Sequence, residues 1–227
     1  MVPRGTMSTD SMAKKAKPGP WATTPIDDLP ARRRAVLAAA FTVLMKKGYA
    51  GASTLDIATE AKVSKRELYG EFGSNIGILD ALIAATAEGM KVPLAAPDFA
   101  DRKGLVEALT RYGVASLVEL THPAVVAINR LAIAEADRGS ELGQILDRHG
   151  REPHREALAG LFRQAQSAGL LRPGDPYRMG GEFFSLLWRD LMQRLLLGVA
   201  KPPDLREIKR RAATATEAVL ALNGPGT

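Results

Sequence analysis

The segment of residues 53–72 leaves little freedom in how the chain folds. Ser53 and Ser64 are favourable N-cap residues, so the segment predicts two short helices, residues 54–61 and 65–72, with a turn at residues 62–63. Two short helices that cross steeply need small or apolar residues on their inward faces. Such residues stand at Ile57, Ala58, Ala61, Val63, Leu68 and Phe72. The spacing therefore predicts a helix-turn-helix.

The outward face of the second short helix carries Lys65, Arg66 and Tyr69, whose side chains can reach phosphates or base edges of DNA. Residues 31–72 hold eight Lys and Arg against four Asp and Glu, so +4 of the net charge of +6 lies there. Such a local excess favours contact with nucleic acid. The alternative is a solvated basic face on an all-helical core, and charge alone does not separate the two.

The rest of the chain predicts helices and no sustained strand. Apolar residues recur at helical spacing over residues 31–47, 75–91, 102–121, 123–139, 141–169, 175–198 and 204–223. The expected fold class is therefore all-α. It has an N-terminal three-helix domain at residues 29–74, a connecting helix at 75–91, and a C-terminal helical domain at 92–227 that begins at a proline-containing break. We expect kinks at Gly150 and Pro153, and expect Gly77 to cost its helix about 1 kcal/mol relative to alanine.

The N-terminal residues 1–28 are small, polar and proline-rich, and predict a disordered arm. Residues 1–6 resemble the remnant of a cleavable tag. No secretory signal and no apolar run near the roughly 20 residues that span a bilayer are present, so we expect a cytoplasmic protein without a membrane partner.

Several classes of chemistry lack their residues in this chain. The absence of cysteine excludes disulfides, cysteine-ligated zinc and cysteine nucleophiles. The three histidines, His122, His149 and His154, have no spacing that completes a metal site, so neither a metal nor another cofactor is expected. No catalytic triad, phosphate-binding loop or dinucleotide fingerprint appears, and the chain is therefore not expected to be an enzyme.

Two apolar stripes in the C-terminal half predict an interface between two copies of the chain. One stripe, on residues 204–223, has heptad-like spacing with small residues in its middle, which allows close helix approach. The second lies on residues 175–198. The expected homodimer interface consists of Leu187, Leu191, Leu195, Ile208, Ala212, Ala215 and Val219. Packing within one chain explains either stripe alone, and that alternative stays open.

The same half offers residues that combine the apolar wall and the polar anchor of a small-molecule cavity. The candidates are Tyr112, Asn129, Phe184, Trp188 and Met192. Ordinary core or interface packing is the alternative for each of them.

The stretch GYAGASTLDIATEAKVSKRELYGEFGSNIGILDALI, residues 48–83, resembles the N-terminal domain of the tetracycline-repressor (TetR) family. The resemblance implies an all-helical homodimer that binds palindromic operator DNA, usually as a repressor released by a small-molecule effector. It also implies roles for single residues. Ser53 or Thr54 would contact a phosphate, Ser64, Lys65 and Arg66 would begin the recognition helix, and Tyr69 would contact a phosphate.

Three residues depart from what such a domain usually carries. Lys62 stands where many such turns have glycine, because that position is left-handed. Glu71 adds a negative charge near the DNA face, and Asn75 replaces a lysine that contacts DNA phosphate in many relatives. The basic arm with Lys14, Lys15 and Lys17 offers compensation. A helical ligand-binding or interaction protein with weakened or lost DNA binding is the alternative that these departures leave open.

Overall fold

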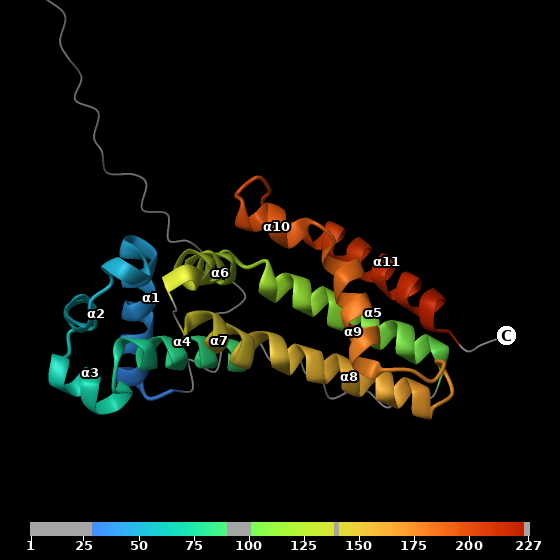
Figure 1. Cartoon of the computed structure of the whole chain (residues 1–227), viewed down its shortest axis with the longest axis horizontal. Helices are drawn as coiled ribbons and strands as arrows, with labels where there is room; N and C mark the ends of the chain where they lie inside the picture. Colours follow the sequence, from blue (N-terminus) through green and yellow to red (C-terminus); the bar gives the residue numbers. More distant parts are fainter. Residues whose placement is uncertain (1–28, 90–100, 139–140, 225–227) are drawn as a thin grey trace, which may run out of the picture.

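The computed structural model describes residues 29–89, 101–138 and 141–224 of the chain. Every regular element in these residues is a helix, which confirms the all-α fold class. The N-terminal helices, at one end of the molecule in Figure 1, are α1 (Ala31–Gly51), α2 (Thr54–Ala61), α3 (Lys65–Phe72) and α4 (Asn75–Gly89). The C-terminal helices are α5 (Arg102–Leu120), α6 (Pro123–Glu135), α7 (Leu142–Leu146), α8 (Glu152–Ser167), α9 (Pro176–Trp188), α10 (Leu191–Leu196) and α11 (Leu205–Asn223).

Two separate cores sit at the two ends of the molecule, and a third joins them. A small core packs α1 against α2, α3 and α4, and a large one packs α5, α8, α9 and α11, with α9 crossing between α8 and α11 (Figure 1). The joining core brings Leu37 of α1 and Leu82 of α4 together with Ile128 of α6 and Leu142 of α7. The predicted domain boundary at residues 92–100 lies outside the described residues.

Most helix ends fall where local sequence signals place them. Regular α1 geometry stops at Gly48, whose φ of 72° and ψ of 176° are non-helical, so the predicted end of this helix is confirmed. The predicted helix over 141–169 consists of α7, a π-helical turn η3 (Asp147–Arg151) that contains Gly150, and α8, with Pro153 in its first turn. A π-helical turn inside a helix often marks a functional position.

The predicted continuous helix over 175–198 is wrong, because it breaks at Arg189. This residue has a φ of 47° and a ψ of −122°, which ends α9 and lets α10 start in a new direction. No glycine or proline stands at the break. The sequence therefore carried no local signal for it.

The seven residues of the predicted homodimer interface lie inside the single chain. Each of them is 5% exposed or less, in the large core around α5. The interface prediction is therefore wrong for Leu187, Leu191, Leu195, Ile208, Ala212, Ala215 and Val219. Heptad spacing shows which face of a helix is buried, and here the neighbouring helices of the same chain cover that face.

Gly77 has a structural role that helix propensity does not predict. A Cβ atom at this position would lie 2.0 Å from the carbonyl oxygen of Phe72, which is backbone and cannot move aside alone. Glycine thus lets α4 start directly against the end of α3. The expected propensity cost of Gly77 is outweighed by the close approach that it allows.

The described residues contain neither a metal-binding cluster nor a single helix that could span a membrane. No group of three or more His, Asp or Glu side chains within them is placed to hold a metal ion. No single helix there is long and apolar enough to cross a membrane, although α5 and α6 satisfy the length and composition criteria together as a pair bent by 67°.

Candidate nucleic-acid interface and ligand site

A capping box fixes the start of each short helix. At α2, the Asp56 N–H donates to Ser53 Oγ (3.1 Å) and the Ser53 N–H donates to the Asp56 carboxylate (3.2 Å). At α3, the Glu67 N–H donates to Ser64 Oγ (3.2 Å) and the Ser64 N–H donates to the Glu67 carboxylate (2.9 Å). Each box satisfies backbone donors that a helix start leaves free. The expected caps at Ser53 and Ser64 are confirmed.

The turn between α2 and α3 has the expected left-handed residue. Lys62 has a φ of 55° and a ψ of 42°, a conformation in which side chains other than glycine carry some strain. The Val63 N–H donates to the Ala58 carbonyl (3.0 Å), and the Val63 side chain packs on the small core. Ala58 and Leu68 are 3% and 1% exposed. These contacts fix the direction of α3 relative to α2.

The exposed face of α3 carries cations that pair with no acid. Lys65, Arg66 and Tyr69 are all exposed, and Lys65 Nζ lies 5.6 Å from the centroid of the Tyr69 ring. Within residues 29–89, 101–138 and 141–224, no carboxylate lies within ion-pair distance of Lys65 or Arg66. The structure therefore presents two unneutralised cations and a phenol side by side on one helix.

The acids of this region turn away from that face and pair with other bases. Glu67 pairs with Arg32, and Glu71 pairs with Arg33 at 3.0 Å, so both acids of α3 lie against cations of α1. The charge that Glu71 was expected to add near DNA is thus offset by a cation. At the start of α2, the hydrogen bond from Lys47 (2.6 Å) is the main cause that lowers the pKa of Asp56 to about 2.

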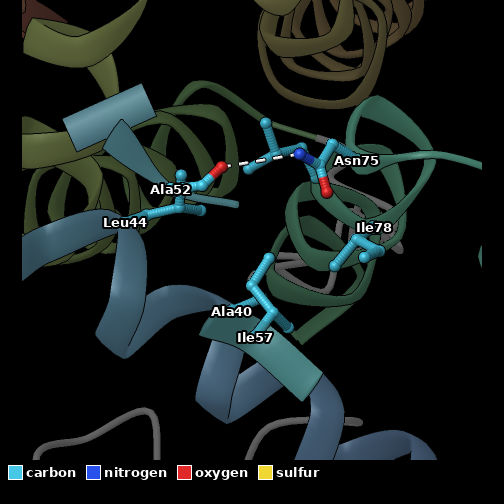
Figure 2. A pocket seen from close by; sticks show the side chains of 7 residues that line it. Ala40, Leu44, Ala52, Ile57, Asn75 and Ile78 are labelled. Atoms are coloured by element: carbon cyan, nitrogen blue, oxygen red, sulfur yellow. Dashed lines mark hydrogen bonds between the residues drawn. The ribbon is translucent and has the colours of Figure 1, made fainter. Parts of the chain in front are cut away.

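Thr54 and Asn75 tie the start of α2 to the start of α4. Thr54 is 6% exposed, and its hydroxyl donates to Asn75 Oδ1 (2.5 Å) and lies 3.3 Å from the Tyr69 hydroxyl. The Asn75 amide donates to the Ala52 carbonyl (3.4 Å; Figure 2). Of the two residues predicted to contact a phosphate at this helix start, Ser53 is exposed and Thr54 is buried. Asn75 positions α2, a role that sequence reasoning missed.

Beside this contact lies a small cavity between α1, α2 and α4. Its volume is about 230 Å³, and Figure 2 shows the side chains around it. It is lined by Ala40, Leu44, Ala52, Ile57, Asn75, Ile78 and Leu79. No residue of α3 lines it, so it does not belong to the exposed face of that helix.

Four of the five ligand candidates gather in the large core. The Tyr112 hydroxyl lies 2.8 Å from His154 Nδ1 of α8, and the rings of His154 and Phe184 have centroids 6.4 Å apart. The ring centroids of Phe184 and Trp188 are 6.1 Å apart, and Met192 packs against the same core. The fifth candidate, Asn129, instead bonds within its own helix: its amide donates to the Val125 carbonyl (2.9 Å).

Sequence reasoning missed three polar members of this cluster: Ser116, Glu119 and, as a ligand candidate, His154. Ser116 and Glu119 follow Tyr112 at the i+4 and i+7 positions of α5, the spacing of one helix face. Ser116 Oγ, Glu119 Oε2 and Trp188 Nε1 are buried without a hydrogen-bond partner. Burial raises the pKa of Glu119 to about 8 and lowers the pKa of His154. Buried polar groups are normally satisfied by protein or by water, so these three atoms, like Arg211 Nη1 of α11, are open to a further hydrogen-bond partner.

Replacing Glu119 by glutamine is expected to stabilise the protein at high pH. Because folding raises the pKa of this carboxyl from 4.5 to about 8, the folded state binds more protons in this interval and stability falls as pH rises through it. Glutamine keeps the shape and does not titrate. Thermal melts should show Glu119→Gln above wild type by about 2–6 °C at pH 9 and close to it at pH 5.

The matched control for this prediction is Glu107→Gln, which changes an exposed acid on the same helix. It should show no difference from wild type that grows with pH. If Glu119→Gln and wild type had the same melting temperature at both pH values, the burial of this carboxyl would be contradicted.

One polar contact links the N-terminal helices to the segment that carries His154. Asp80 of α4 pairs with Arg148 and lies 3.1 Å from His149 Nε2, both in the π-helical turn. That turn continues directly into α8, whose first turn holds His154. A single helical segment thus touches α4 at one end and the aromatic cluster at the other.

Family models match both ends of the chain. Residues 36–82 match the model described as bacterial regulatory proteins, tetR family. Residues 107–225 match the model described as the C-terminal domain of AefR-like transcriptional repressors. Comparison with curated proteins gives no significant match.

Solved structures with the same fold are transcriptional regulators. A TetR regulator from Agrobacterium tumefaciens is 31% identical, with a TM-score of 0.73, over 87% of this chain and 96% of that one. A TetR-family regulator from Mesorhizobium loti is 28% identical, with a TM-score of 0.70, over 85% and 96% of the two chains. The flavonoid-responsive regulator FrrA is 26% identical, with a TM-score of 0.74, over 86% and 98%.

These matches extend over both the helix-turn-helix and the C-terminal helices, and the proteins and models matched are regulators rather than enzymes. They support the DNA-binding function that the sequence analysis weighed against a helical protein with weakened or lost DNA binding. The chain belongs to the TetR family and is a DNA-binding transcriptional regulator with a C-terminal ligand-binding domain.

Proposed function

We propose that this regulator binds a palindromic operator as a homodimer and that a small-molecule effector releases it. The observation that carries the proposal is the pair of cations on α3, Lys65 and Arg66, which face solvent while the acids of the same helix pair with α1. A helix of this kind enters the major groove with its first residues at the bases. An effector shifts such an equilibrium only by its different affinity for the two states.

Each residue of the proposed DNA interface has a role that follows from its position. Lys65 and Arg66, in the first turn of α3, would reach base edges or phosphates, and Arg66 can form two parallel hydrogen bonds to guanine. Tyr69 and the exposed caps Ser53 and Ser64 would contact phosphates, which fix register without reading sequence. Thr54 would act indirectly, because its buried hydroxyl holds α2 to α4.

The effector would bind at the cluster around Tyr112, His154, Phe184 and Trp188. Three unpartnered buried polar atoms and a row of aromatic rings support this assignment. Ligand pockets combine such apolar walls with a few placed polar groups. An aromatic effector suits the row of rings, and one similar regulator is named as flavonoid-responsive.

A partner copy would meet the outer faces of α9 and α11. These helices lie side by side, joined by the hydrogen bond from the Asn223 amide to Glu182 (2.8 Å). Their exposed residues include several small ones, which allow close approach of a second copy: Gly181, Ser185, Thr214 and Ala221. A two-fold dimer places two copies of α3 on two half-sites, so a symmetric operator is expected.

Selection of bound sequences from random duplex DNA tests the proposal. Wild-type protein should enrich an inverted repeat whose half-site centres lie about 10 bp apart, or a multiple of that spacing. The double variant Lys65→Ala, Arg66→Ala is the matched control and should enrich no motif. A single asymmetric motif from the wild type would contradict the dimer, and the absence of any motif would contradict operator binding.

A further inference from the structure

We propose that the effector site takes an organic cation with an aromatic or apolar body, whose charge pairs with Glu119 and whose body packs against Phe184 and Trp188. This inference deepens the proposed function, because it rests on the assignment of the aromatic cluster as the effector site. It adds the charge and the chemical class of the ligand.

The first support is a half-buried acid that has no base beside it and whose Oε2 atom is fully buried. Within the described residues, no Arg, Lys or His nitrogen lies within ion-pair distance of Glu119, and Glu119 Oε2 accepts no hydrogen bond. Burial alone accounts for the raised pKa of this carboxyl. Without a base the carboxyl keeps its proton at neutral pH, and a bound cation would stabilise its ionised form.

The second support is the row of rings that begins at Tyr112, seven residues before Glu119 on α5. The Glu119 charge is close enough to Tyr112 to add to the effect of burial, which raises the pKa of the Tyr112 hydroxyl. From Tyr112 the cluster continues through His154 to Phe184 and Trp188. Aromatic faces attract cations, most strongly when water is excluded. One acid together with several rings is therefore a setting for a lipophilic cation.

The third support is that neither of two bases, His154 and Arg211, pairs with Glu119. Burial lowers the pKa of His154, which disfavours a positive charge on this ring, and its Nδ1 already lies within hydrogen-bond distance of the Tyr112 hydroxyl. Arg211 Nε of α11 donates to Glu207 on its own helix (2.8 Å), while Arg211 Nη1 is buried without a hydrogen-bond partner. Within the described residues no ion pair joins Arg211 to Glu119, so the Glu119 carboxyl is left to pair with a cationic ligand.

A matched pair of probes tests the charge. Benzyltrimethylammonium is a cation, and neopentylbenzene has the same shape with carbon in place of nitrogen. The chain has two tryptophans, so the full-length Trp21→Phe variant leaves Trp188 as the only indole reporter. Titration of its fluorescence with each probe gives two affinities. We expect the cation to bind at least 10-fold more tightly than the neutral probe.

The variant Glu119→Gln in the same background shows whether this carboxyl causes the preference. It should bring the two affinities within about twofold, since glutamine keeps the shape and removes the charge. The variant Glu107→Gln, an exposed acid on α5, should keep the full preference. Thermal melts confirm that each variant is folded.

Three results would overturn the inference. Equal affinity of the two probes in the Trp21→Phe protein would exclude charge recognition, and tighter binding of the neutral probe would assign the site to uncharged ligands. A cation preference that survives Glu119→Gln would place the charge contact elsewhere.

The DNA selection described above is run on the same preparation, so the two proposals fail separately. If an inverted repeat is enriched but the cation is not preferred, the inference of a cationic ligand is refuted and the operator proposal stands. A cation preference without any enriched DNA would remove the operator proposal and leave the chemistry of the site in place.

Discussion

Replacing Arg66 by alanine is expected to weaken binding to the selected operator by about 5- to 150-fold, which corresponds to roughly 1–3 kcal/mol. The Arg66 side chain is exposed in the first turn of α3, within the part of the helix that reaches base edges. The loss should concentrate at one base pair of each half-site. Fluorescence anisotropy with a labelled operator gives the affinity, and light scattering should show an unchanged oligomer.

The matched control is Lys103→Ala, which removes an exposed cation at the start of α5. Both variants lose one positive charge, so a general electrostatic effect would appear in both. Only Arg66→Ala should lose affinity beyond a twofold change. Equal affinities of the two variants would remove Arg66 from the DNA interface.

Replacing Gly77 by alanine is expected to destabilise the protein by at least about 1–3 kcal/mol, the usual cost of an overpacked site. Helix propensity predicts the opposite sign, a gain of about 1 kcal/mol. The structure decides between the two, because the new Cβ would lie 2.0 Å from the backbone oxygen of Phe72. The start of α4 must then move away from the end of α3. Operator affinity should fall together with the melting temperature.

Gly70→Ala is the matched control for that prediction. Gly70 lies inside α3, and a Cβ there would meet nothing within 4 Å. Only propensity acts at this position, so the melting temperature should rise slightly. A rise of similar size in Gly77→Ala would show that the contact with Phe72 is relieved without cost.

The helix-turn-helix could be predicted from the sequence because its signals are local. Ser53 and Ser64 cap helices within three residues of themselves, and the left-handed turn at Lys62 follows from its place between them. Ala58 and Leu68 are buried as the spacing requires. Each inference needed only neighbours within about 20 residues in the chain. Over this range, helix geometry determines which side chains face each other.

The C-terminal half could be predicted only as helices, because its arrangement depends on distant contacts. The stripe through Ile208 and Ala212 gives the buried face of α11, but whether α5 or a second copy covers it depends on the tertiary fold. The break at Arg189 has no local signal. Glu119 is inconspicuous in the sequence and becomes notable only when the fold buries it without a partner.

The three departures from the usual TetR-like pattern have structural explanations in this chain. Lys62 adopts the left-handed conformation that the turn requires, and Glu71 pairs with Arg33. Asn75 accepts a hydrogen bond from the Thr54 hydroxyl and donates one to the Ala52 carbonyl. A lysine at this position could not accept the hydrogen bond from Thr54. None of them removes the exposed cations of α3.

The central claim is that this chain reads a specific operator through α3, and one affinity comparison tests it most directly. Wild-type protein is titrated against the enriched inverted repeat and against a scrambled duplex of the same composition, at physiological salt. The account predicts a preference of at least about 10³-fold for the inverted repeat, since specific binding exceeds non-specific binding by this much or more. Equal affinities for the two duplexes would contradict it.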